Sequence, residues 1–159
     1  MRSSSADKKQ EIASLQAILI RETDPATIDF QKGRGLYTQR CSACHELFGE
    51  GGKVGPNLTG SDRKNVGYLL ENIVDPSASV PGDYQMSIVS MKDGRVLTGA
   101  VMNRRDPVVR LRMMAEELKI DGNEIDEIKG LGMSLMPEGL LNGLSEEDLV
   151  DLFGYLRSQ

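Results

Sequence analysis

The sequence predicts a mainly α-helical domain with an inserted β-hairpin or small antiparallel sheet before its last loop and helix. Apolar residues recur at helical spacing in four segments, at residues 6–21, 29–41, 65–74 and 146–158. Between residues 84 and 113 the pattern changes to the alternation typical of strands. Two glycine-rich segments, at 48–61 and 130–139, are predicted to be loops.

A clear break separates the first two helices. The apolar stripe of the first consists of Ile12, Leu15, Ile18 and Leu19. The sequence Asp24-Pro25 ends this helix, because proline cannot continue a helical hydrogen-bond pattern. The second helix carries Phe30, Leu36 and Tyr37 and leads into the fragment CSACH at residues 41–45.

The middle of the chain changes from helix to strands. The helix at 65–74 is expected to end before Asp75-Pro76. Residues 87–101, SIVSMKDGRVLTGAV, form two alternating runs around Asp93-Gly94, a pair typical of two-residue hairpin turns. The fragment VVRLRM at 108–113 continues the alternation. We therefore expect a β-rich insertion at about residues 84–130.

The last helix has a well-defined start. Ser145 is expected to be its N-cap, and Asp148 stands where the acidic partner of a capping box belongs. The buried stripe of this helix is predicted to contain Leu149, Leu152, Phe153 and Leu156.

Composition narrows the functional classes. The apolar fraction of 39% and aromatic fraction of 4%, without Trp, are low for a self-sufficient core, which suggests that an apolar group from outside the chain completes it. The formal charge is −5 and no basic stripe is present, so nucleic acid is not an expected partner. No apolar run reaches the ~18 residues that a membrane span needs. The first residues lack the layout of a secretory signal, so the chain is expected to be either cytoplasmic or cut from a longer exported protein.

The fragment CSACH contains both cysteines and the only histidine of the chain. Its pattern, Cys-x-x-Cys-His, is typical of covalent haem attachment. Two thiols three positions apart near a helix end can each reach one vinyl group of a porphyrin. The following residue, His45, then supplies an imidazole nitrogen to the iron. The sequence therefore predicts one covalently bound haem c on Cys41, Cys44 and His45.

Three other interpretations of this fragment are weaker. A structural zinc site needs four ligands, and only Cys41, Cys44 and His45 are offered unless aspartates complete the set. A thioredoxin-like redox pair normally follows a strand, whereas the residues before Cys41 are predicted to be helical. A disulfide between cysteines three positions apart would constrain almost nothing.

An iron bound to one histidine leaves a sixth position, for which methionine is the available residue type. Met136 is the preferred candidate because it lies in a predicted loop, precedes Pro137 and stands just before the last helix. Met133 is its near rival. The remaining methionines after Met1 lie in or beside predicted strands and are interpreted as core residues: Met86, Met91, Met102, Met113 and Met114.

Two long fragments, residues 33–60 and 134–158, resemble class I cytochrome c. The resemblance covers about residues 28–76 and 130–158 and implies the class I cytochrome c fold. It implies that Gly33 and Tyr37 pack against Leu152 and Tyr155 where two helices cross. It also implies that the carbonyl of Pro56, in the segment Gly-Pro-Asn-Leu, accepts a hydrogen bond from His45, and that Met136 is the distal ligand.

The middle of the chain departs from that family, and its features resemble a haem-binding domain of planctomycetes and their relatives. The fragments are GEGGKVGPNLTG, DPSASV, DGRVLTGAV and SLMPEGL. In those large proteins the domain follows a membrane-associated, dehydrogenase-like propeller, so the chain is expected to be an excised domain. We expect residues 1–27 to be a helical linker or extension and residues 28–159 the cytochrome c domain.

The expected function is that of a one-electron carrier and not of an enzyme by itself. With histidine and methionine on either side, the iron stays low-spin, and both the thioether and burial raise its reduction potential. The resemblance implies a dehydrogenase as electron donor, in the same polypeptide, and a downstream cytochrome or oxidase as acceptor. Because thioether attachment occurs outside the bacterial cytoplasm, the expected location is the periplasm or the outer face of the membrane.

Other interpretations stay open. The alternative function is a haem peroxidase or a gas or redox sensor with a dissociable Met136, in which Glu138 is the nearby carboxylate. The insertion is interpreted either as a docking surface for the dehydrogenase or as a cap over the haem edge. By family analogy Arg63, Lys64 and Tyr68 are candidate donors to the haem propionates, and simple solvated surface is the competing interpretation.

Overall fold

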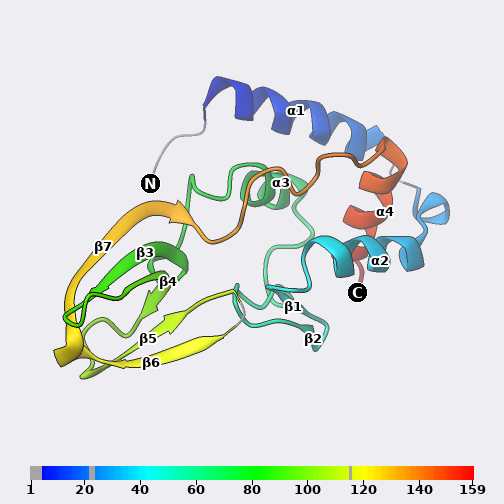
Figure 1. Cartoon of the computed structure of the whole chain (residues 1–159). Helices are drawn as coiled ribbons and strands as arrows, with labels where there is room; N and C mark the ends of the chain where they lie inside the picture. Colours follow the sequence, from blue (N-terminus) through cyan, green and yellow to red (C-terminus); the bar gives the residue numbers. More distant parts are fainter. Residues whose placement is uncertain (1–4, 22–23, 115) are drawn as a thin grey trace. The chain divides into compact units, whose positions relative to one another are not determined.

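The computed structural model describes residues 5–21, 24–114 and 116–159. Two compact units can be distinguished in this part of the chain (Figure 1). The helical unit comprises the residues up to Pro76 together with Pro137–Gln159. The β unit comprises Ser77–Met136. The chain therefore leaves the helical unit once and returns to it once.

Within its described residues the helical unit contains four α-helices. They are α1 (Ala6–Arg21), α2 (Phe30–Arg40), α3 (Val66–Val74) and α4 (Glu146–Leu156). Each matches a predicted helical segment to within a few residues at its ends. A two-residue hairpin, β1 (Glu46–Leu47) and β2 (Glu50–Gly51), follows α2.

Side-chain caps fix where three of these helices begin. Asp29 caps α2 and Asn65 caps α3, each by accepting a hydrogen bond from a backbone N–H of the first turn. Ser145 caps α4 in a complete capping box: the Asp148 N–H donates to its Oγ at 3.0 Å, and its own N–H donates to Asp148 Oδ2 at 3.1 Å. The predicted box is confirmed.

Helices α2 and α4 cross in close contact, as Figure 1 shows. A Cβ added to Gly33 on α2 would lie 2.1 Å from the backbone oxygen of Asp151 on α4 and 2.8 Å from the Cβ of Tyr155. The rings of Tyr37 and Tyr155 lie next to each other, with centroids 5.6 Å apart. Only glycine allows the two backbones to approach this closely. The expected packing of Gly33 and Tyr37 against Tyr155 is confirmed.

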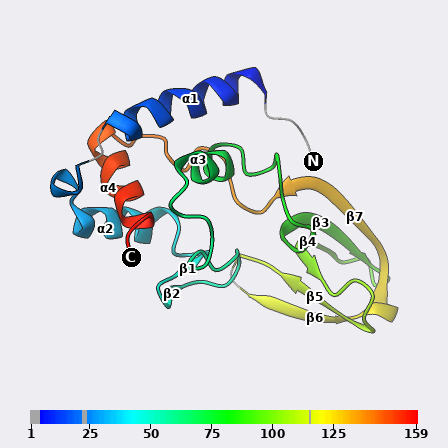
Figure 2. The ribbon, with the colours of Figure 1, turned by 180° about the vertical axis from the view of Figure 1, so that it is seen from behind.

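One apolar core holds the helical unit together. Its buried members come from all four helices and from β1: Leu19, Tyr37, Leu47, Leu69, Leu70, Val74, Leu149, Val150, Leu152, Phe153 and Leu156. From α1, Ile12 and Leu15 also pack against this core. Figure 2 shows the unit from behind, with α1 along its side. The first helix is therefore part of the packed unit through one apolar face.

The β unit is a single five-stranded antiparallel sheet in the order β6-β5-β4-β3-β7. Its strands are β3 (Gln85–Met91), β4 (Val96–Met102), β5 (Val108–Arg112), β6 (Glu117–Asp121) and β7 (Ile125–Ser134). The predicted turn at Asp93-Gly94 joins β3 and β4. One face carries the core residues of the unit, which are Val89, Met91, Val101, Val109, Leu111 and Ile120.

Strand β7 differs from the predicted loop at 130–139, since it extends to Ser134. Its half-buried residues recur every third position, at Ile125, Ile128, Leu131 and Ser134. Two register shifts against β3 cause this spacing, because each places extra β7 residues opposite a shorter stretch of its partner. The period-two signal of a strand is therefore absent from the sequence of β7, although the strand is present.

The predicted fold class, mainly α with the class I cytochrome c fold, is wrong. Of the described residues, 37% are helical and 25% are in strands. The insertion is larger than expected for a hairpin or small sheet, because β6 and β7 join the three strands expected from alternation. It also has an apolar core of its own. The structure is therefore a mixed α and β structure made of two units.

The close approach at Gly33 predicts a large difference between two glycines of α2. Gly33→Ala should lower the free energy of unfolding by about 2–3 kcal/mol, because the methyl group meets the Asp151 backbone. The control is Gly35→Ala, where an added Cβ meets no atom within 4 Å. This variant should be more stable by about 0.5–1 kcal/mol, because alanine favours helix. Chemical unfolding followed by circular dichroism measures both, and equal effects would contradict the proposed packing.

Candidate functional site

The fragment CSACH continues directly from the C-terminal end of α2. The N–H groups of Cys41 and Ser42 donate to the carbonyl of Tyr37, at 2.8 and 3.0 Å. Those of Cys44 and His45 then donate to the carbonyl of Cys41, at 3.1 and 3.0 Å. The backbone therefore makes one further turn after the helix, and this turn carries both thiols and the imidazole.

A buried tyrosine anchors the far end of this turn. The hydroxyl of Tyr37 donates a hydrogen bond of 2.8 Å to the carbonyl of His45. Only 3% of Tyr37 is exposed, and burial raises the pKa of its hydroxyl well above the ordinary value. The hydroxyl therefore keeps its proton and remains a donor over the physiological pH range. Tyr37 thus links the α2–α4 crossing to the position of His45.

The imidazole of His45 is held in one orientation. His45 is buried, and its Nδ1 lies 2.8 Å from the carbonyl oxygen of Pro56. A carbonyl can only accept, so Nδ1 must carry the proton and Nε2 must carry the lone pair. Among the described residues Nε2 has no hydrogen-bond partner. The hydrogen bond to Pro56 that the resemblance implies is present, and it leaves Nε2 ready to bind a metal.

The glycine-rich loop after the motif packs closely against it. A Cβ on Gly55 would lie 2.6 Å from Cε1 of His45, and a Cβ on Gly51 would lie 2.0 Å from its carbonyl oxygen. Gly52 is equally close to the carbonyl oxygen of Ala43, at 2.2 Å. The Gly55 N–H donates to the Cys44 carbonyl at 2.7 Å. Three glycines are therefore required for the loop to lie against the turn.

Both cysteines are free thiols with partly exposed side chains. Burial raises the pKa of Cys41 to about 11, although the neighbouring Arg40 opposes the shift. Burial also raises the pKa of Cys44 above its ordinary value. At neutral pH both sulfur atoms are therefore protonated. The turn therefore carries two reduced cysteines that are not joined by a disulfide.

These residues fit covalently attached haem. The chemistry of the donor set agrees with the group: two free thiols and one imidazole, on a single turn, with the imidazole nitrogen Nε2 unpartnered among the described residues. The close glycines keep side chains away from His45 on the side of the loop. The residues that would hold haem are therefore Cys41, Cys44 and His45.

Comparisons with known proteins point in the same direction. A family model described as cytochrome c oxidase, cbb3-type, subunit III matches residues 29–88. A curated cytochrome c of Stellaria longipes is 48% identical over 42 residues, which are 26% of this chain and 39% of that protein. The match thus spans about two fifths of that relative's length.

These matches support a cytochrome c domain. The same two matches also support covalently bound haem c. Both matches lie in a part of the chain, and neither addresses the number of haem groups or the axial ligands. The assignment of individual residues to the site therefore rests on the geometry and stays a prediction.

Two predicted propionate donors, Arg63 and Tyr68, have different environments. Arg63 is buried above the ring of Phe48, and its Nη1 donates to the carbonyls of Leu156 and Ser158 at the end of α4. Its Nε donates to Thr59. Arg63 therefore stabilises the C-terminal end of α4. Tyr68 lies on α3 and is 40% exposed. Their roles as propionate donors stay predictions.

The methionine candidates lie at the end of the β unit. Met136 is its last residue, half-buried, and its N–H donates to the Ser134 hydroxyl at 3.0 Å. Met133 lies near the end of β7 and is 46% exposed. His45 belongs to the helical unit, so the pairing of Met136 with His45 stays a prediction.

In the described part of the chain, no three His, Cys, Asp or Glu side chains form a group suited to hold a metal ion. None of its helices has the length and apolar character needed to cross a membrane.

Sequence reasoning missed two features of the site. The hydrogen bond from Tyr37 to the His45 carbonyl was not expected, because Tyr37 was considered only for the helix crossing. The contact of Gly55 with the imidazole was also missed. The density of glycine between residues 49 and 55 was its only signal in the sequence. A loop with this many glycines indicates close backbone approach as well as a turn.

The contact at Gly55 predicts a specific effect of one methyl group. Gly55→Ala should lower the free energy of unfolding by about 1–3 kcal/mol and reduce the fraction of chains that carry covalent haem, because the methyl group displaces the imidazole. The control is Gly60→Ala, where an added Cβ meets no atom within 4 Å. Its stability should change by less than about 0.5 kcal/mol. Unfolding curves and mass spectrometry of both variants test this expectation, which fails if the two behave alike.

Proposed function

We propose that this chain is a c-type cytochrome domain that carries one electron at a time between partner proteins. The observation that carries the proposal is the oriented imidazole of His45, with Nδ1 bound to Pro56 and Nε2 unpartnered, next to two free thiols. The comparisons support a c-type cytochrome electron carrier as the class of function. The donor, the acceptor and the location are the finer parts of the proposal.

The protein residues perform three tasks in this function. Cys41 and Cys44 would hold the porphyrin through thioether bonds, since the S–H of each can add across one vinyl group. His45 would bind the iron through Nε2, and its hydrogen bond to Pro56 fixes the ring and increases its basicity. When bound, haem c supplies an iron that alternates between the ferric and ferrous states.

A fixed ligand sphere favours electron transfer over binding of a substrate. The Tyr37 hydroxyl, the Pro56 carbonyl and Gly55 contact different parts of His45, so the imidazole has little freedom to move when the charge of the iron changes. Met136 is the proposed second axial ligand, on the basis of its position before Pro137 and of the resemblance to class I cytochrome c. Its thioether favours the ferrous state and raises the reduction potential.

The proposed partners are a dehydrogenase as donor and a respiratory cytochrome or oxidase as acceptor. The name of the matching family model, a subunit of a cbb3-type oxidase, supports a place in respiration. The resemblance of four fragments to haem-binding domains of planctomycetes supports a dehydrogenase-like domain in the same polypeptide. Thioether attachment occurs outside the bacterial cytoplasm, so the proposed location is the periplasm or the outer face of the membrane.

No observation favours the alternative of a haem peroxidase or sensor. Glu138, the carboxylate considered for acid–base chemistry, forms an ion pair with Lys8 at 3.1 Å. This carboxylate is therefore already engaged with a side chain of α1.

The attachment chemistry can be tested directly. The full chain, produced in a host that matures c-type cytochromes, should carry one covalent porphyrin by mass spectrometry and give a low-spin ferrous spectrum. Replacing both Cys41 and Cys44 with Ala should remove the covalent mass, because no thiol remains. Ser42→Ala is the control between them and should keep it. A wild-type chain without added tetrapyrrole mass would refute the proposed function.

The sixth ligand is tested by two neighbouring methionines. Met136→Ala should abolish the weak long-wavelength band of ferric iron bound to methionine sulfur and lower the reduction potential by on the order of 0.1 V. Met133→Ala should keep the band and the potential. Visible spectra and redox titration of both variants distinguish the two residues. If the band is lost only in Met133→Ala, the assignment to Met136 is incorrect.

A further inference from the structure

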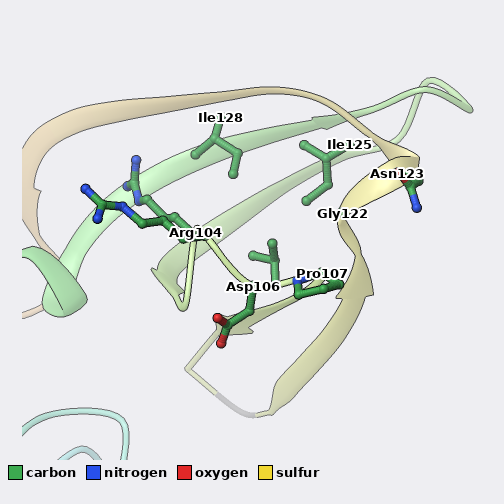
Figure 3. Close-up of a pocket in the computed structure, with 9 residues that line it drawn as sticks. Arg104, Asp106, Pro107, Gly122, Asn123, Ile125 and Ile128 are labelled. Atoms are coloured by element: carbon green, nitrogen blue, oxygen red, sulfur yellow. The ribbon is translucent and has the colours of Figure 1, made fainter.

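The β unit contains a cavity that the proposed electron transfer does not use. Its volume is about 390 Å³, within the range of small-molecule sites. The lining residues come from the loop 104–107, from residues 122–123, and from β5 and β7 (Figure 3). All of them belong to Ser77–Met136, so the cavity lies within one unit.

One wall of the cavity is apolar and continuous with the core of the β unit. Val109 is 3% exposed and belongs to the buried cluster, while Ile125 and Ile128 are half-buried and pack against it. Figure 3 shows the two isoleucines of β7 pointing towards the loop that contains Pro107. A ligand in this cavity therefore needs an apolar part, since a fully hydrated ion would leave these side chains without a partner.

Arg104 is a charged residue of the cavity whose guanidinium is anchored to the sheet. Its Nη2 donates a hydrogen bond of 2.8 Å to the hydroxyl of Ser87, which is fully buried on β3. Ser87 pairs with Gly99 on β4 and with Gly130 on β7. Paired residues share one face of a sheet, so this row of three carries only one short side chain. A Cβ on Gly130 would meet no atom within 4 Å, which leaves room for the arginine.

The rest of the Arg104 guanidinium is available. Its Nε and Nη1 have no hydrogen-bond or ion-pair partner among the described residues, and neither has the guanidinium of the adjacent Arg105. Asp106 also lines the cavity. Its carboxylate, however, points away from Ile125 and Ile128 in Figure 3. The loop therefore presents an excess of positive charge next to the apolar wall.

We propose that this cavity binds a small carboxylate with an apolar body. Besides the N–H groups of Nε and Nη1, one hydrogen of Nη2 is not used by Ser87, so a carboxylate can place its two oxygens along the edge that Nη2 forms with Nε or with Nη1. The hydrogen bond to Ser87 fixes the guanidinium beforehand, which reduces the entropy lost on binding. The apolar body lies against Val109, Ile125 and Ile128. The site is separate from Cys41, Cys44 and His45, so it stands or falls independently of the proposed electron transfer.

Hexanoate is a suitable probe, and two related compounds distinguish the contribution of its carboxylate from that of its hydrocarbon chain. The full haem-loaded chain in its ferrous, diamagnetic state is titrated and followed by amide and methyl NMR. Hexanoate should give saturable shifts at Val109, Ile125 and Ile128 with a Kd on the order of 1 mM, and leave the visible spectrum unchanged. Acetate has the carboxylate without the hydrocarbon chain. Hexylamine has the hydrocarbon chain with a positive charge in place of the carboxylate. Both should bind at least about tenfold more weakly.

Two variants and a control assign the binding to Arg104. Arg104→Gln should raise the Kd for hexanoate by about tenfold or more, because a charged bidentate contact is lost. Ser87→Ala should raise it by about fivefold, because Arg104 loses its anchor. Arg95→Gln is the control, since Arg95 is an exposed arginine of the same unit paired with Asp93. It should leave the Kd unchanged. The proposal is overturned if hexanoate does not bind saturably, if hexylamine binds equally well, or if Arg104→Gln binds like the wild type.

Discussion

The position of His45 depends on contacts with two other segments of the helical unit, α2 and the loop at residues 55–56. The hydroxyl of Tyr37, on the helix before the motif, binds its carbonyl, and the carbonyl of Pro56, beyond the motif, binds its Nδ1. Gly55 lies against its ring at a distance that excludes any side chain. Because Tyr37 also packs against Tyr155 on α4, the crossing of α2 and α4 and the orientation of the imidazole form one structure. Loosening the crossing would therefore also disturb the orientation of the imidazole.

Local signals made the helical unit largely predictable. The fragment CSACH contains its chemistry within five residues, so no long-range contact is needed to recognise it. The caps at Asp29, Asn65 and Ser145 act within their own first turns, although only the cap at Ser145 was predicted from the sequence. The contacts of Gly55 and of the Tyr37 hydroxyl were not predictable in the same way. Both depend on how a loop without periodicity returns to the motif.

The predicted fold class was wrong because part of the sheet in the β unit has no strand signal in the sequence. In β7, register shifts replace alternation with a spacing of three, so Ile125, Ile128 and Leu131 do not resemble a strand in sequence. Strand β6 is only five residues long. The three strands expected before it already accounted for the small sheet that the sequence predicted. The resemblance to an α-helical family also described the two ends of the chain and was silent on the middle. The extent of the sheet therefore depends on strand pairing between distant residues, which local sequence patterns do not reveal.

The two ends of the β unit lie near each other. The N–H of Ser134 donates to the Ser77 hydroxyl at 3.1 Å, and Ser134 pairs with Gln85 at the start of β3. A segment with adjoining ends can be removed or exchanged with only a short replacement peptide, because the flanking chain is not stretched. Evolution can therefore add, lose or diversify this sheet as a module while the helices of the other unit stay intact. The same property makes it a convenient position for grafting other domains onto the helical unit.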